Sequence, residues 1–124
     1  MPRAILLIAH GSRSATANDD LHHVADLLRQ REHPIVVASF LELAEPNIEA
    51  GGRECVRLGA DEVVMVPYFL SAGVHVRRDL TAARQGLSEV FPAVPFVLAE
   101  PLGRHPLLVE IVEERMRQSI TTQE

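Results

Sequence analysis

The sequence predicts an α/β fold: a three-layer, doubly wound domain with a four-stranded parallel sheet between helices. Short apolar runs alternate with longer amphipathic stretches four times along the 124 residues. The runs show no regular alternation of apolar and polar residues, as expected for strands that are buried on both faces. Four such units favour a parallel sheet with right-handed crossovers, and we expect the strand order 2-1-3-4.

The predicted strands are the apolar runs, and they end at proline, glycine or polar residues. They cover residues 4–9, 35–41, 62–67 and 95–99. The first, Ala4–Ala9, is apolar throughout and leads directly into His10. It is too short for a secretory signal, so we do not expect it to be one.

The helices are predicted from apolar stripes and from signals at their ends. They cover residues 15–31, about 46–58, about 76–90, and a last stretch that begins at Pro106. Pro46 suits the first turn of the second helix, and Gly59 suits its C-cap. The packed face expected for the last helix consists of Leu108, Ile111, Val112 and, at its edge, Arg115.

Size and composition limit the classes of protein to consider. The chain is long enough for one domain, expected at residues 1–120 and followed by a short polar tail at 121–124. A net charge of −5 argues against a nucleic-acid-binding protein, and no apolar run reaches the roughly 20 residues of a membrane helix. The single cysteine, Cys55, excludes an internal disulfide, so a cytoplasmic location is the default expectation.

Residues able to carry chemistry follow all four predicted strands. In order, these are His10, Glu42, the segment Tyr68–His75, and Glu100 with Arg104 and His105. Carboxyl ends of parallel strands meet at one edge of the sheet, where such folds bind their ligands. The sequence therefore predicts a functional site at that edge.

Two imidazoles at this edge indicate an open metal site. His75 stands near a predicted helix start, where the helix dipole favours the neutral imidazole that binds metals. With His10 and at most the carboxylate of Glu42, the ligand set is too small for a closed structural site. The residues Tyr68, Phe69, Leu70 and Val74 form an apolar wall beside it, with Arg13, Arg77, Arg78 and Arg104 nearby. This combination suits a large, flat ligand with anionic edges.

Other interpretations of His10 stay open at this point. It could be a structural residue of the turn, and Gly11 with Ser12 could hold an anion at the helix start. A His-Gly pair after a strand also occurs in histidine phosphatases, but Ala9 occupies the position of their arginine, which weakens that interpretation.

Four motifs, in order, are more specific than any one residue. They are His10-Gly11-Ser12-Arg13 with Asn18, the segment Phe40–Pro46, the segment Pro67–Asp79 with Gly73 and His75, and the segment Pro101–Pro106. Through them the chain resembles, from the first strand to the last helix, the small class II tetrapyrrole chelatases: CbiX-type sirohydrochlorin cobaltochelatases and the related sirohydrochlorin ferrochelatases. A small departure is Thr81, where many members have proline.

The resemblance implies an ATP-independent lyase that inserts a divalent ion into sirohydrochlorin, on the way to cobalamin or siroheme. The metal is a substrate, Co²⁺ or Fe²⁺ with Ni²⁺ as a further option, and no organic cofactor is expected. His10 and His75 would bind the metal, His10 would also accept a proton, and Glu42 would assist. Residues expected to bind the substrate are Arg13, Glu45, Tyr68, Phe69, Leu70, Ser71, Ala72, Gly73, Val74 and His75.

Longer relatives of this kind contain two such domains, so the resemblance also implies that a single-copy chain forms a homodimer. The charge and the short apolar runs give no reason to expect a nucleic-acid or membrane partner. The alternative from a different functional class is a non-catalytic carrier of a tetrapyrrole or a metal on the same fold. Such a carrier would need the loop and the arginines but no proton acceptor.

Overall fold

The computed structural model describes residues 2–123, and the side chains of residues 2–120. Strands β1 (Arg3–Ala9), β2 (Ile35–Phe40), β3 (Glu62–Pro67) and β4 (Phe96–Leu98) form one parallel sheet. Its order is β2-β1-β3-β4, which confirms the predicted topology. The helices are α1 (Ala15–Gln30), α2 (Ile48–Arg57), α3 (Val74–Val90) and α4 (Leu107–Gln123).

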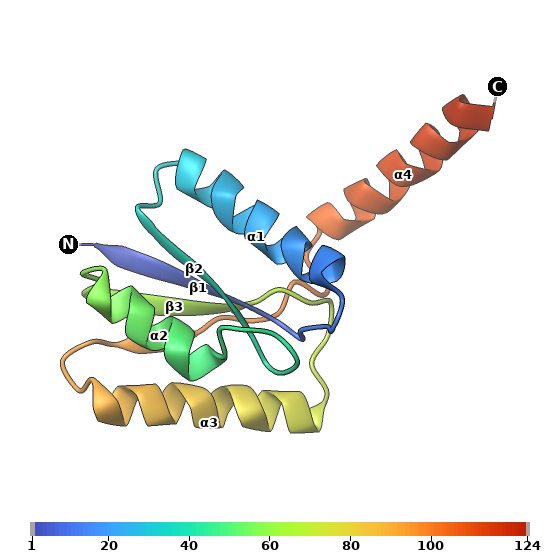
Figure 1. Cartoon of the computed structure of the whole chain (residues 1–124). Coiled ribbons are helices and arrows are strands. Elements are labelled where there is room, and N and C mark those ends of the chain that lie inside the picture. Colours follow the sequence, from blue (N-terminus) through green and yellow to red (C-terminus); the bar gives the residue numbers. More distant parts are fainter. Residues whose placement is uncertain (1, 124) are drawn as a thin grey trace.

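Helices cover the two faces of the sheet unequally (Figure 1). The chain moves one way across the sheet from β1 to β2 and the other way from β2 to β3 and β4. Right-handed crossovers therefore place α1 on one face, and α2 and α3 on the other. A core of Leu6, Ile8, Met65, Leu80 and Leu87 lies under α2 and α3. A second, smaller core on the α1 side contains Leu7, Leu21, Ala25 and Phe40.

Helices α2 and α3 each start two residues away from the predicted position, and α4 starts one residue later, at Leu107. Pro46 is not in the first turn of α2, because its carbonyl accepts a hydrogen bond of 2.9 Å from the Phe40 N–H and so stays beside β2. The helix begins two residues later, at Ile48, capped by Asn47. Helix α3 begins at Val74 rather than Val76, which places His75 inside its first turn.

The prediction for the last helix is wrong within a single chain. Helix α4 projects away from the sheet (Figure 1), and its expected packed face is exposed, Ile111 by 50% and Val112 by 68%. Strand β3 was also expected to be buried on both faces, but buried and half-buried residues alternate along it. Both findings have one cause: among residues 2–123, no helix covers β3 and β4 on the α1 side.

The backbone of α4 runs to Gln123, while the side chains of the predicted polar tail at 121–124 lie outside the described residues, so the domain limits stay a prediction. In the part of the chain that the structure describes, no helix has the length and apolarity needed to cross a membrane.

Candidate functional site

His10 and Glu42 lie together at the carboxyl edge of the sheet because the pairing of β1 and β2 continues past both strands. The Leu41 N–H donates to the Ala9 carbonyl at 2.9 Å, and the Glu42 N–H donates to the His10 carbonyl at 3.1 Å. The next residue, Gly11, has φ +94°, and a Cβ on it would lie 1.8 Å from the Glu42 carbonyl oxygen. Only glycine fits here, so the two segments can approach closely.

Two further contacts fix the His10 segment. The imidazole ring of His10 packs against the ring of Phe69, with centroids 4.4 Å apart and 30° between the planes. Asn18, from the first turn of α1, accepts a hydrogen bond from the Ser12 N–H at 3.0 Å and donates to the Ser12 carbonyl at 2.7 Å. Phe69, which was predicted to form part of the apolar wall, therefore also supports the His10 ring.

A cleft of about 360 Å³ opens beside His10 and Glu42. Its lining residues are His10, Leu41, Glu42, Asn47, Ile48, Glu49, Val76 and Asp79. His75 is exposed and is not one of them, but it belongs to the same first turn of α3 as Val76. Residues four apart share a helix face, so His75 and Asp79 lie on one side of α3. The cleft thus joins the ends of β1 and β2 to the helix that carries His75.

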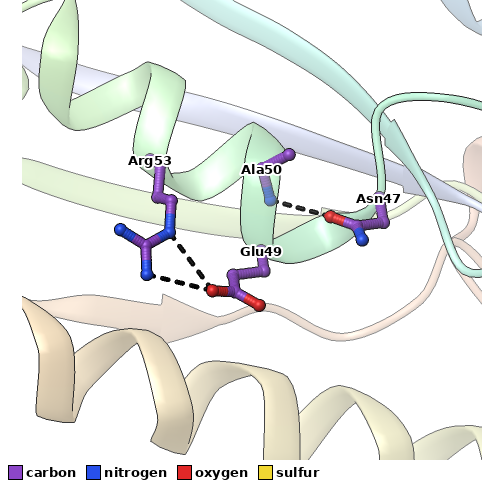
Figure 2. A network of polar contacts seen from close by, with 4 residues as sticks. All are labelled: Asn47, Glu49, Ala50 and Arg53. Atoms are coloured by element: carbon purple, nitrogen blue, oxygen red, sulfur yellow. Dashed lines mark hydrogen bonds and ion pairs between the residues drawn. The ribbon is translucent and has the colours of Figure 1, made fainter.

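Asn47, Glu49 and Asp79 line this cleft but were not among the predicted site residues. Figure 2 shows Asn47 accepting a hydrogen bond from the Ala50 N–H at 2.8 Å, which caps α2. It also shows the Glu49 carboxylate paired with Arg53 at 3.0 Å along the helix. The asparagine before an amphipathic run is a cap signal, and Asp79 stands four residues after His75. Neither signal indicates that the residue lines the cleft.

A second cleft, of about 450 Å³, lies on the other side of the loop after β3. Its lining residues are Leu70, Ser71, Ala72, Arg77, Glu100, Pro101, Gly103, Arg104 and Leu108. Arg77 donates to the Ala72 carbonyl at 3.2 Å and lies 3.7 Å from the carboxylate of Glu100. A Cβ on Gly103 would lie 1.7 Å from the Leu70 carbonyl oxygen, so the loops after β3 and β4 pack backbone to backbone.

The remaining predicted site residues lie at the same edge without lining either of these clefts. They are Arg13, Glu45, Tyr68, Phe69, Gly73, Val74 and His75, and all but Phe69 are exposed. His105 has a structural contact, because its Nδ1 accepts a hydrogen bond from the Leu107 N–H at 3.2 Å at the start of α4. Cys55 is buried in the core, and this burial raises the pKa of its thiol to about 12, so it offers no thiolate to a metal.

The donor set is small and open. Within the described residues, no three side chains of His, Cys, Asp or Glu come close enough together to hold a metal ion. An imidazole and a carboxylate in an open cleft can take up protons, or hold a hydrated divalent ion while leaving positions for a second ligand. A closed structural metal site does not fit this arrangement.

Comparison with known proteins places the chain in a family. The CbiX family model matches residues 4–119. A sirohydrochlorin cobaltochelatase of Sulfolobus acidocaldarius is 30% identical over 96% of this chain and 94% of its own length. A chloroplastic sirohydrochlorin ferrochelatase of Arabidopsis thaliana is 31% identical over 94% of this chain.

The chain spans about half of that plant protein, 52% of its length. The same holds for the sirohydrochlorin chelatase SirB of Bacillus subtilis subspecies spizizenii, solved in complex with cobalt. It superposes with a TM-score of 0.86 and 30% identity over 95% of this chain and 51% of its own. The match extends from the first strand into the last helix and includes every segment that builds the site. The chain belongs to the CbiX family.

Proposed function

We propose that the protein inserts Co²⁺ or Fe²⁺ into sirohydrochlorin without ATP. The macrocycle gives up two pyrrole N–H protons and receives one M²⁺ ion, so the reaction needs a metal-binding group and a proton acceptor side by side. The observation that carries the proposal is the cleft in which His10 and Glu42 both stand, beside the first turn of α3. The cobalt and iron named for its relatives support the choice of ions.

In this proposal His10 holds the ion at one moment and receives a pyrrole proton at another, because one imidazole lone pair cannot do both at once. The ring of Phe69 holds the imidazole in place, 4.4 Å away between centroids. A fixed ring loses little rotational entropy when it binds. His75 would hold the ion from the α3 side, and Glu42 would pass protons from the cleft to solvent.

The macrocycle would bind along the loop after β3, with Glu45 and residues Leu70–Val74 against it. Its peripheral carboxylates would pair with guanidinium groups, which bind carboxylates in a bidentate manner. Arg77 and Arg104 line the second cleft, and Arg13 stands exposed at the same edge. The 3.7 Å separation of Arg77 from Glu100 is too long for a strong ion pair, so a substrate carboxylate could compete for this guanidinium.

The test measures metal insertion through the change in absorbance. Metal-free sirohydrochlorin is mixed with the protein, and Co²⁺, Fe²⁺ or Ni²⁺ is supplied in turn. The wild type should turn over many times faster than the uncatalysed background. The double variant His10→Ala with His75→Ala should lose about 100-fold or more, since proton transfer alone contributes on that scale. His23→Ala is the matched control, because His23 is an exposed histidine of α1 outside this edge, and its rate should stay unchanged.

Two results would contradict the proposal. A wild-type rate in a folded double variant would remove both histidines from the reaction. Metallation that stops at one product per chain would instead identify the non-catalytic carrier.

A further inference from the structure

Leu43, in the loop after β2, has a backbone conformation that leucine rarely adopts. Its φ is +64°, in the left-handed region where a Cβ crowds the following carbonyl oxygen. At Gly11 and Gly59 the chain uses glycine for a positive φ, which costs nothing there. Among the described residues, two other side chains share this conformation, Glu32 and Arg104, and both are charged. Backbone preference therefore does not explain a leucine at this position.

Packing in the core does not explain the leucine either, because the Leu43 side chain is 54% exposed. It belongs to neither of the two apolar cores. Its neighbours on both sides are fixed by contacts of their own. The Glu42 N–H donates to the His10 carbonyl at 3.1 Å, and Ala44 packs against the core on the α1 side. The loop thus holds Leu43 exposed between two anchored residues.

The sheet topology places Leu43 on one side of His10 and the apolar wall on the other. Strand β1 lies between β2 and β3, so His10 stands between the loops that follow those two strands. Both loops are hydrogen-bonded to the end of β1. On the β2 side this bond is the one from Glu42 to His10, and on the β3 side the Tyr68 N–H donates to the Ile8 carbonyl at 2.6 Å.

Exposed apolar side chains therefore stand on both sides of His10. On the β3 side, Leu70 is 63% exposed and Val74 is 71% exposed, and on the β2 side Leu43 is 54% exposed. Apolar surface that gathers around a few polar groups is typical of sites for small-molecule ligands. A flat macrocycle centred over His10 would cover apolar side chains of both loops at once.

We propose that Leu43 is a further substrate-binding residue, which contacts the macrocycle from the β2 side while the apolar wall contacts it from the β3 side. The inference rests on the proposed function, because it takes sirohydrochlorin as the ligand. The positive φ then has a use, since it keeps the side chain out of the core and available to the ligand. Strained residues of this kind gather at ligand sites, where binding rather than folding requires them.

The test measures two properties of the same variants: the Kd for metal-free sirohydrochlorin, from its absorbance and without metal, and the midpoint of urea unfolding. Leu43→Ala and Leu43→Gly should each weaken binding by about tenfold, because the burial of a leucine side chain contributes on that scale. Leu43→Gly should also unfold at a higher urea concentration than the wild type, since glycine relieves the positive φ. A residue that only supported the fold would give the opposite change.

Two further variants serve as controls. Leu43→Met keeps an apolar side chain of similar size and should retain most of the wild-type affinity. Leu58→Ala makes the same truncation at a leucine that is 46% exposed. Leu58 follows α2 and precedes β3, so it lies at the opposite edge of the sheet, and its replacement should leave the Kd unchanged.

Three results would overturn the inference. One is wild-type affinity in both Leu43→Ala and Leu43→Gly. Another is weaker binding together with a lower urea midpoint in Leu43→Gly, which would show that Leu43 supports the loop rather than the ligand. The third is a wild type that does not bind sirohydrochlorin, which would overturn the proposed function as well. Weaker binding by both variants at an unreduced midpoint supports the inference even if the wild type inserts no metal, whereas that lack of turnover would overturn the proposed function alone.

Discussion

Gly11 determines how closely the segments of His10 and Glu42 can approach. Replacing it with alanine should destabilise the fold by about 2 kcal/mol or more, because a positive φ disfavours any side chain and the new Cβ would meet the Glu42 carbonyl oxygen at 1.8 Å. To relieve this clash, the His10 segment must move away from Glu42, and this movement should lower the rate of metal insertion. Urea unfolding and the absorbance assay measure the two effects.

Gly59→Ala separates the two causes. Gly59 has φ +104°, but a Cβ there would meet nothing within 4 Å. It should therefore show the cost of the backbone conformation, about 1–2 kcal/mol, with activity unchanged. If Gly11→Ala destabilised the protein no more than Gly59→Ala and kept full activity, the close approach would not matter to the site.

Among the individual residues, those at the strand ends were predictable from the sequence, but those that α2 and α3 add to the cleft were not. His10 and Glu42 were predictable because the ends of two buried strands place them at one edge of the sheet. Asn47 and Asp79 were not predicted, because their place in the cleft depends on how the two helices pack against each other. Spacing within one element does not determine the packing between two elements.

Among the elements, α2 contributes its cap residue Asn47 and its first-turn residues Ile48 and Glu49 to the cleft. Removing its cap with Asn47→Ala should cost about 1 kcal/mol of unfolding free energy, because the Ala50 N–H loses its acceptor at 2.8 Å. Asn47→Asp retains an acceptor oxygen and is the matched control. Equal midpoints of urea unfolding for the two variants would show that the cap contributes nothing.

The elements themselves were mostly predictable, and the errors in their bounds are largest at the starts of two helices. β3 was placed correctly at both ends, and the strand order followed from buried runs and handedness. The starts of α2 and α3 were wrong by two residues, because Pro46 stays bonded to β2 and because the helical turn at Val74 needs no proline or cap side chain. Local signals give an element's type more reliably than its first residue.

For the whole molecule, the apolar pattern of α4 predicts a buried helix face but does not indicate which chain covers it. The expected face of Leu108, Ile111 and Val112 has the pattern of a packed helix, yet Ile111 and Val112 are exposed on the single chain. Hydrophobic periodicity predicts that a helix face is buried, but it does not indicate which surface covers that face.

The homodimer that the resemblance implies would make thermal stability depend on protein concentration, because unfolding then separates two chains. Each tenfold dilution removes about 1.4 kcal/mol from a dimer, so a hundredfold dilution should lower the Tm by several degrees. The exposed apolar residues of α4 are the surface to test, and Val112→Glu places an unpaired charge among them. If they lie in the dimer interface, that variant should melt lower and at a Tm that no longer changes with concentration. Glu114→Gln, on the polar side of the helix, should keep the wild-type dependence. Differential scanning calorimetry over that range is the measurement, and a wild-type Tm that stays constant would mean that the chains do not associate.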